Sequence, residues 1–457
     1  MENNTENKNI LLIGIISIFL GVIFTYLFFD QSLGVNFPIF ISACACAGIF
    51  LLRSYGKPQS NAGRLLLVLA CFFGVMVFVR SSELLTFFNF IASLLLLGIF
   101  IDTSSRKSLM EYLPIDYLRV FILPFAIVFP FFLTINKIFT LPRFIKKHPK
   151  QKEIVRGVIV SVVLLAIFTA LFSSADMIFG EYISKLFSFD INIESEVWVR
   201  IITTVIVTAF CLGALGYMLV KKHVVQDHSS INERSAGWLE VAIVFSSINV
   251  LFFIFILFQI SYLFGGVEHL LEKGLTYAEY ARTGFYQLIA VAILSYLVIS
   301  IAERFIIKNS GSHIRSFKLL SIVLISQVIL ILASAFVRLS LYEHAYGFST
   351  IRLYSYALMI WLGVIMAMLS WHIITNGTRQ IFARNAFVSV VVLLIAMNMI
   401  NPDAYIARRN IARYEESGKI DTEYLASLSS DAVPQTVRLL DSEVKYQFAH
   451  DLSWNIN

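Results

Sequence analysis

The chain has 457 residues, of which 58% are hydrophobic and only 14% are charged. A soluble domain carries about 25% charged residues, so this composition excludes an ordinary soluble protein and indicates that lipid surrounds most of the chain. The net charge of +6 does not indicate nucleic-acid binding, because the Lys and Arg residues lie in short loops between apolar segments rather than in a basic tail.

Apolar segments long enough to cross a membrane follow one another along the chain. In lipid each of them must be helical, because an unpaired backbone polar group there is costly. We therefore predict an all-α, polytopic transmembrane bundle of about twelve spans, each crossing ~30 Å of hydrocarbon. The predicted spans are residues 10–29, 35–52, 64–80, 84–101, 117–136, 156–175, 198–220, 241–264, 283–303, 317–337, 352–374 and 383–400.

The Lys and Arg residues in the loops set the predicted orientation. The most basic loop, 137–156, is expected in the cytoplasm, and the acidic segment 176–197 is then outside. Continued alternation places 338–351 and the C-terminal tail outside. The first five spans do not satisfy the same rule, so the side of the N-terminus and a full crossing by 117–136 are left open.

Three regions are expected along the chain: N-terminal transmembrane helices (1–116), a main transmembrane region (117–400) and an extramembrane helical tail (401–457). Asn401-Pro402 predicts a helix start, because Asn can cap a helix and Pro suits its first position. Gly418 predicts the end of that helix. Further short helices should begin near Asp421 and Ser430. These pieces are too short to fold alone, so the tail is expected to dock on the membrane region.

The stretch 249–286 joins two spans through an outer-face turn. Gly265-Gly266 ends the first span, and Thr276 with Glu279 forms a capping box at the start of the next. Arg282 follows inside that helix near the interface. It either extends its side chain to the membrane surface or belongs to a ligand site.

Few polar residues lie within the spans. Asn249 and Gln259 share one predicted helix, and Gln327 lies on another. Such groups either hydrogen-bond between helices or line a substrate path. Asp, Glu, Lys and Arg are missing from the span centres, which argues against a pump with a carboxylate at the membrane midplane.

Charged and aromatic residues gather at the predicted outer ends of the spans. Arg338, His344 and Arg352 lie in and around the Tyr-rich segment SLYEHAYGFSTI, which we predict to be a linker. One interpretation is an outward cleft in which the Arg side chains bind an anionic headgroup or a glycan phosphate. The other is an aromatic and basic belt at the membrane interface.

No motif for catalysis or for a metal is recognisable. The eight His residues are scattered, and the sequence holds neither an H-E-x-x-H pair nor a nucleotide-binding glycine motif. The four Cys residues lie inside apolar segments, where they are expected to act as small core residues. No catalytic residue, cofactor or metal is therefore assigned.

Five segments occur in an order that carries a family resemblance. They are LFSSADMIF (171–179), NVLFFIFILFQISYLFGG (249–266), GLTYAEYARTGF (274–285), RLSLYEHAYGFSTIRLY (338–354) and NPDAYIARRNIARYEESGKIDTEYLASLSSDAVP (401–434). Together they resemble the bacterial membrane-protein family catalogued as domain of unknown function 4173, with its relative 4153. The resemblance covers roughly residues 150–435 and implies an integral membrane protein of the bacterial cell envelope. It implies no activity and no site residue.

Two functional hypotheses follow for a multi-pass protein of the bacterial cytoplasmic membrane. The first is a transporter or flippase-like protein that handles a lipid-linked or small anionic compound. It predicts a cavity lined by Arg282, Arg338 or Arg352. The second is a non-transporting envelope scaffold, sensor or assembly partner. It predicts a tail docked on the outer segments with a residual exposed patch. Membrane lipids and an envelope protein are the expected partners, and nucleic acid is not.

Overall fold

The computed structural model describes residues 2–57, 59–105, 108–120, 195–219, 238–264, 285–306, 311–442 and 444–456. Every regular element in these ranges is helical, in agreement with the predicted all-α class. Contacts divide the chain into two compact units. Unit 1 comprises 1–64, 100–105 and 120–221, and unit 2 comprises 65–99, 106–119 and 222–457. The predicted division at 116 and 400 stays a prediction.

Unit 1 is built around a close pair of long helices. Its described helices are α1 (Glu2–Phe28), α2 (Asn36–Ser54) and α9 (Ser195–Leu219), and α1 packs on both of the others. A Cβ added at Gly21 would collide with the Thr208 side chain and lie 2.9 Å from the Thr204 carbonyl. The Thr25 and Thr204 hydroxyls hydrogen-bond at 2.6 Å. Small residues and hydroxyl pairs are how helices approach closely in lipid, where burial of apolar surface gives little drive.

Unit 2 contains most of α3 (Asn61–Val79) and α4 (Glu83–Ser105), followed by η1 (Leu109–Glu111) and α5 (Pro114–Arg119). The Ser93 hydroxyl on α4 donates to the Ala70 carbonyl on α3 at 2.8 Å. Fully buried Asn89, on the same helix, exchanges two amide hydrogen bonds with Asn398, at 2.9 and 2.7 Å. These contacts join segments that are 309 residues apart in the sequence.

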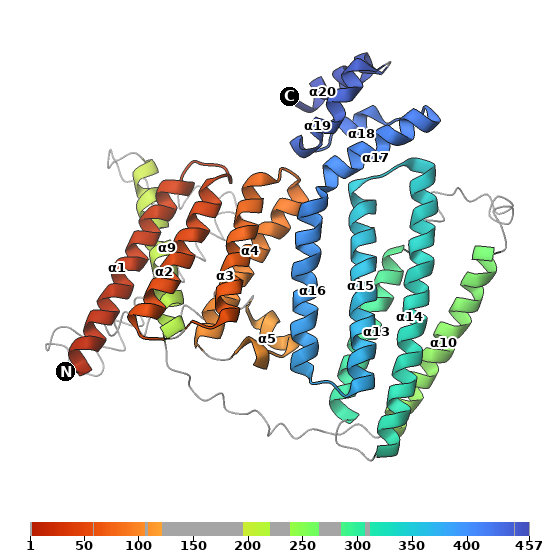
Figure 1. Ribbon diagram of the computed structural model, residues 1–457, viewed down its shortest axis with the longest axis horizontal. Helices are drawn as coiled ribbons and strands as arrows, with labels where there is room; N and C mark the ends of the chain where they lie inside the picture. Colours follow the sequence, from red (N-terminus) through yellow and green to blue (C-terminus); the bar gives the residue numbers. More distant parts are fainter. Residues whose placement is uncertain are drawn as a thin grey trace, which may run out of the picture. The chain divides into compact units, whose positions relative to one another are not determined.

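The largest core of unit 2 lies among its five later long helices (Figure 1). These are α10 (Trp238–Phe264), α13 (Phe285–Ile306), α14 (Gly311–Tyr346), α15 (Thr350–Thr375) and α16 (Arg379–Ile400). Helix α14 packs against α10, α13 and α15, and α15 packs against α16. Fully buried Ile299, Leu324 and Met366 come from three of these helices and belong to one hydrophobic cluster.

Eight described helices are long and apolar enough to cross a membrane, namely α1, α2, α3, α4, α9, α14, α15 and α16. Shorter apolar stretches at Val241–Leu257 and Val291–Glu303 match two further predicted spans. The predicted span 156–175 and all but the first residues of 117–136 lie outside the described residues. The multi-pass architecture is therefore confirmed, whereas the predicted count of about twelve spans is not.

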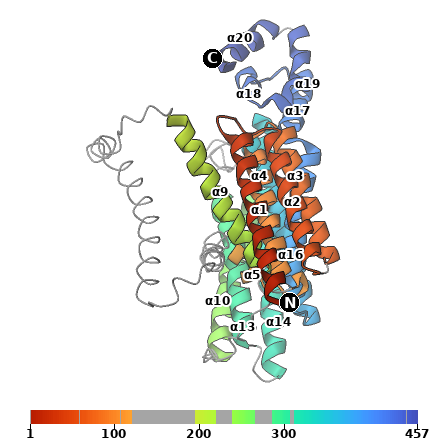
Figure 2. The ribbon, with the colours of Figure 1, turned by 90° about the vertical axis from the view of Figure 1, so that its left-hand side faces the viewer.

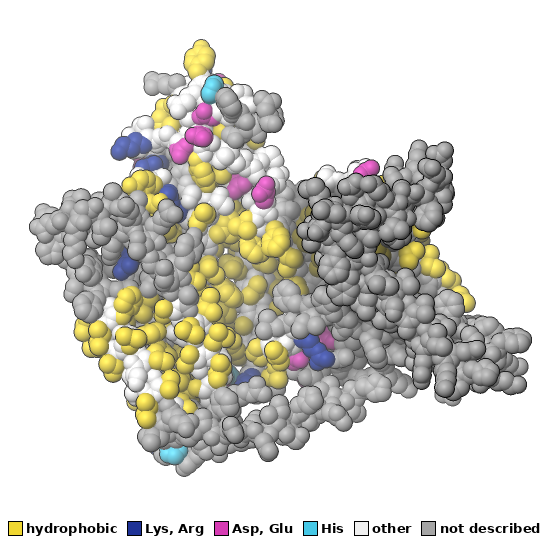
Figure 3. Space-filling model, turned by 180° about the vertical axis from the view of Figure 1, so that it is seen from behind, with side chains coloured by type: hydrophobic (Ala, Val, Ile, Leu, Met, Phe, Trp, Pro, Cys, Tyr) yellow, Lys and Arg dark blue, Asp and Glu magenta, His cyan; other side chains and the backbone are white. Residues whose placement is uncertain are grey.

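The outer surface of these helices suits lipid. Within each candidate span only 17% to 44% of the residues are buried inside the protein, so most apolar side chains point outward. On the face shown in Figure 3, hydrophobic side chains cover the helices beneath the tail, and charged side chains gather mostly on the tail. An apolar band with charges beyond its end is the pattern that a bilayer requires.

Helix α14 differs from the prediction. Its 36 residues extend for about 54 Å at 1.5 Å per residue, well beyond a ~30 Å hydrocarbon core. The segment after Arg338, predicted to be a linker, continues the helix to Tyr346, and only Gly347–Ser349 separates α14 from α15. Residues 339–346 contain neither Gly nor Pro, so nothing in them stops the helix. The helix ends at Gly347, which adopts a φ of 80°.

The tail forms a compact helical cluster at one end of α14, α15 and α16 (Figures 1 and 2). Its elements are α17 (Pro402–Ser417), α18 (Thr422–Ala426), η4 (Ser430–Ala432), α19 (Val433–Thr436), η5 (Val437–Asp441) and α20 (Lys445–Ile456). Ala407, Leu425 and Phe448 form its core, with Ile411, Ala432 and Leu439.

The predicted helix boundaries in the tail are confirmed at three points. Helix α17 starts at Pro402 and is closed by Gly418, which has a φ of 68°. The Asp421 carboxylate caps α18 by accepting from the Tyr424 N–H at 2.9 Å. The prediction that Asn401 caps with its side chain is wrong. Asn401 takes a left-handed conformation, which ends α16 and starts α17 through the backbone alone.

Candidate functional site

The tail is attached to the bundle at the short turn between α14 and α15. We call this contact the tail joint, formed by residues 345–350 with Asn410, Arg413 and Tyr424. The last carbonyls of a helix have no partner within it and carry the negative end of the helix dipole. Here the Arg413 guanidinium donates to the Ala345 carbonyl at 2.7 Å, and the Arg352 guanidinium donates to the Gly347 carbonyl. Two cations therefore cap the end of α14.

Asn410 makes the most specific contact of the tail joint. Its side-chain oxygen accepts from the Phe348 N–H at 2.8 Å, and its amide donates to the Phe348 carbonyl at 2.9 Å. One side chain thus satisfies both backbone groups of a residue that belongs to no helix. The neighbouring Gly347 leaves the room for this, because a Cβ there would lie 2.6 Å from the Asn410 side-chain oxygen.

Tyr424 closes the tail joint from α18. Its hydroxyl oxygen accepts from the Thr350 N–H at 2.7 Å and lies 3.1 Å from the Thr350 hydroxyl. Burial raises the pKa of the Tyr424 hydroxyl above its ordinary value, since the ionised form is poorly solvated there. The tail therefore holds the first residue of α15 through a neutral phenol.

A second attachment links the tail to the turn between α3 and α4. The Ser430 hydroxyl donates to the Ser81 hydroxyl at 2.7 Å, and the Ser81 N–H donates to the Asp431 carboxylate at 3.2 Å. Within the tail, the buried Asp403 carboxylate accepts from the Ser429 hydroxyl at 2.5 Å. The tail is therefore fixed to the ends of two helix pairs of unit 2.

The three predicted outer ligand residues do not share one environment. Arg352 is engaged by the Gly347 carbonyl and lies 4.1 Å from the centroid of the Tyr342 ring. His344 is exposed in the last turn of α14, and half-buried Arg338 lies two turns earlier on the same helix. In this geometry Arg352 has a structural task, which sequence reasoning did not assign to it.

Two of the predicted polar residues connect helices of unit 2. The Asn249 amide donates to the Leu320 carbonyl at 3.1 Å, so α10 is tied to α14. The Gln327 amide returns a bond to the Asn249 carbonyl at 3.0 Å. Gln259 lies in α10, and its side chain is outside the described part. Thr276, Glu279 and Arg282 also lie outside the described residues.

A hollow of ≈ 410 Å³ occurs in unit 1. Its lining residues are Thr25, Tyr26, Leu27, Phe29, Gln31 and Arg200. The Arg200 guanidinium lies 4.4 Å from the centroid of the Phe29 ring at its edge. Arg338 and Arg352 do not line this hollow.

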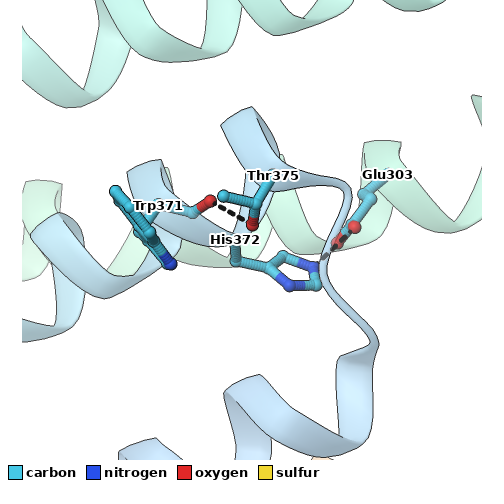
Figure 4. A network of polar contacts seen from close by, with 4 residues as sticks. All are labelled: Glu303, Trp371, His372 and Thr375. Carbon is cyan, nitrogen blue, oxygen red and sulfur yellow. Dashed lines mark hydrogen bonds and ion pairs between the residues drawn. The ribbon is translucent and has the colours of Figure 1, made fainter.

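A largely buried acid–base pair lies at the other end of α15 (Figure 4). His372 Nε2 is 2.8 Å from a Glu303 carboxylate oxygen, which links α15 to α13. The two side chains are 5% and 18% exposed. Figure 4 shows the His372 ring directed toward Glu303, whereas Trp371 points away from it. The Phe382 ring from α16 lies 5.4 Å from the His372 ring.

Sequence reasoning missed this pair and the Asn89–Asn398 pair. Glu303 was predicted to be the last residue of a span, and His372 lies near the end of the predicted span 352–374. Both of these ends were predicted to face the cytoplasm. An acidic residue and a histidine at the same membrane level on two spans is the signal that would have suggested their contact.

The fold and these contacts define a class before any comparison is made: a multi-pass, all-helical membrane protein with a docked helical tail. A family model described as a domain of unknown function (DUF4153) matches residues 67–439. The match covers more than half of the chain, which therefore belongs to this family. The 4153 part of the sequence resemblance is thus confirmed, and the 4173 part stays a prediction. No curated protein and no solved structure matches the chain.

Proposed function

We propose that the protein is a non-transporting component of the bacterial cell envelope, in which the tail is a fixed platform for a protein partner. The observation that carries this proposal is the tail joint. A segment that served only as a loose end would not need an amide exchange between Asn410 and Phe348, a guanidinium cap from Arg413 and a half-buried phenol at Tyr424. Together these contacts hold the tail in one orientation.

The surface left on the docked tail supports a partner. Val433, Val437 and Leu440 follow one another along α19 and η5 and are 48%, 50% and 43% exposed. Exposed aliphatic residues on an extramembrane module mark an interaction surface when they gather together. The distribution of loop charges favours a tail on the outer side of the cytoplasmic membrane, which is part of this proposal. The partner is then an envelope protein with an apolar contact of its own.

Native mass spectrometry of the protein in lipid discs tests the proposal. We expect a protein subunit in fixed stoichiometry with the wild type, and its loss from the triple variant Val433→Asn/Val437→Asn/Leu440→Asn. The matched control is Glu423→Gln/Lys445→Gln, which changes exposed polar side chains of the same tail. The proposal is contradicted if the wild-type tail resists protease, and is therefore docked, but no protein subunit is bound.

Transport of a small anionic or lipid-linked compound is the second candidate, and the Glu303–His372 pair is the observation that favours it. Ionisable side chains buried between spans are unusual and mark ion or substrate pathways by default. In the same mass spectra, a lipid-linked compound bound to the wild type and lost from Glu303→Gln would support transport. Retention of that compound by Glu303→Gln would count against this pair as part of a pathway.

A further inference from the structure

Helix α17 carries its cations where the membrane spans end. It follows α16 after the single residue Asn401, so its first turns lie beside the ends of the spans (Figure 1). Arg408 and Arg409 are both exposed. Arg409 lies 5.4 Å from the centroid of the Phe348 ring, which belongs to the turn between α14 and α15. The level of this cation is therefore fixed by the turn itself.

The two guanidiniums belong to one cation–aromatic cluster. Arg408 lies 5.6 Å from the centroid of the Tyr405 ring, and that ring contacts the Phe348 ring edge-to-face at 5.6 Å. Aromatic faces hold guanidiniums in place without neutralising them. Within the described part of the chain, neither Arg408 nor Arg409 forms an ion pair with a carboxylate. Two ordered cations are thus presented side by side.

The stability of α17 does not explain the order of its charges. The helix dipole favours cations in the last turn and carboxylates in the first. The first turn of α17 follows this rule, with buried Asp403, but the last turn does not: it holds no basic residue, and exposed Glu415 and Glu416 lie there. The cations are near the membrane end and the carboxylates about 10 Å further along the helix at 1.5 Å per residue. This order suits a negatively charged membrane surface.

We propose that Arg408 and Arg409 form a binding site for the phosphate of an anionic lipid headgroup. A guanidinium offers paired N–H donors that match phosphate oxygens. The rings of Tyr405 and Phe348 hold the two donors at the level of the headgroups, where aromatic side chains are favoured. The site concerns lipid and not the protein partner proposed above, so either proposal can fail alone.

Lipid binding by the full-length protein in detergent tests this site. Native mass spectrometry and thermal unfolding are followed while phosphatidylglycerol, phosphatidylcholine or inorganic phosphate is added. We expect selective binding of, and protection by, phosphatidylglycerol. Each arginine removed should weaken that binding about 5-fold, as expected for one cation near an anionic surface. The variants are Arg408→Gln and Arg408→Gln/Arg409→Gln.

The control variant is Glu415→Gln/Glu416→Gln, which changes two charges on the same helix and should bind phosphatidylglycerol at least as well as the wild type. Arg408→Gln removes a contact made only within α17, so it tests the site without loosening the tail joint. Unchanged phosphatidylglycerol binding by the double arginine variant overturns the proposal. Equal protection by inorganic phosphate overturns the assignment to lipid.

Discussion

The polar side chains at the two ends of α15 bind different kinds of partner. At the Thr350 end, charged and polar side chains hydrogen-bond to backbone groups. Arg352 and Asn410 bind the turn, and Tyr424 binds the first residue of the helix. At the Thr375 end, two side chains bind each other, and His372 meets Glu303 between helices. The first end attaches a module, whereas the second joins two spans by an ionisable contact.

The kind of partner at each end indicates what that end of α15 is suited to do. Backbone-directed contacts satisfy a fixed geometry and leave their cations little freedom to bind anything else. The Glu303–His372 contact instead joins two side chains on different helices. The Thr350 end is therefore suited to holding the tail. The Thr375 end is suited to holding α13 against α15.

The largest expected effect comes from breaking the pair at the Thr375 end. His372→Ala should lower the free energy of unfolding by about 2–3 kcal/mol, because the largely buried Glu303 carboxylate loses its partner. Titration with a denaturing detergent measures this loss. His344→Ala is the matched control, since His344 is exposed on α14. Hydrogen exchange of residues 402–456 should be the same in both variants, and a released tail would contradict the independence of the two ends.

Next in size is a backbone change at the tail joint. Gly347→Ala should destabilise tail docking by about 2 kcal/mol, because Gly347 has a φ of 80° and a Cβ would crowd the Asn410 oxygen. Hydrogen exchange of the tail should rise while α13 stays protected. Gly363→Ala, within α15, is the control, since open space surrounds that position. An undisturbed tail in Gly347→Ala would mean that the turn does not define the joint.

A smaller effect is expected from the side chain that pairs with the turn. Asn410→Ala removes two hydrogen bonds to Phe348, so tail docking should lose about 1.5 kcal/mol. Limited proteolysis, which cuts a released tail faster, measures the change. Asn385→Ala, at an exposed position of α16, should cut at the wild-type rate. If the tails of Asn410→Ala and Asn385→Ala are cut at the same rate, the tail is attached mainly by contacts other than the Asn410–Phe348 hydrogen bonds.

The smallest effect depends on pH. Because burial raises the pKa of Tyr424, the folded tail holds that proton more tightly than the unfolded tail. The stabilisation that the protonated Tyr424 hydroxyl gives the folded tail is therefore complete below the ordinary pKa near 10, and it is lost as the pH rises above that value. Tyr424→Phe should cost about 1 kcal/mol at neutral pH, through its lost contact with Thr350. The difference in unfolding temperature between the wild type and this variant should stay constant up to about pH 10 and narrow as the pH rises further. A constant difference would place the Tyr424 hydroxyl in water.

The sequence predicted what depends on local chemistry. Spans follow from apolar length alone, and Pro402, Gly418 and Asp421 fixed helix boundaries in the tail because each acts on its own backbone. The end of α14 was misplaced for the opposite reason. A polar, Tyr-rich segment was taken as a linker, although nothing before Gly347 breaks a helix and the tail contacts beyond it stabilise the extension.

The site residues were harder to predict because their partners are distant in the sequence. Arg352 was assigned to a ligand hypothesis since its partner, a backbone carbonyl at a helix end, has no signature in the sequence. Asn89 and Asn398 find each other across 309 residues. An amide in an apolar segment predicts that a partner exists, and only packing decides which one.

Asn401 has a mechanical consequence. One residue in a left-handed conformation ends α16 and begins α17, so no slack separates a span from the tail. A rotation of α17 would therefore also turn the end of α16. The Asn398 side chain, one turn back, is bonded to Asn89, and its carbonyl accepts from Arg80 at 2.5 Å. Through these bonds, such a rotation would also act on α4, a second span.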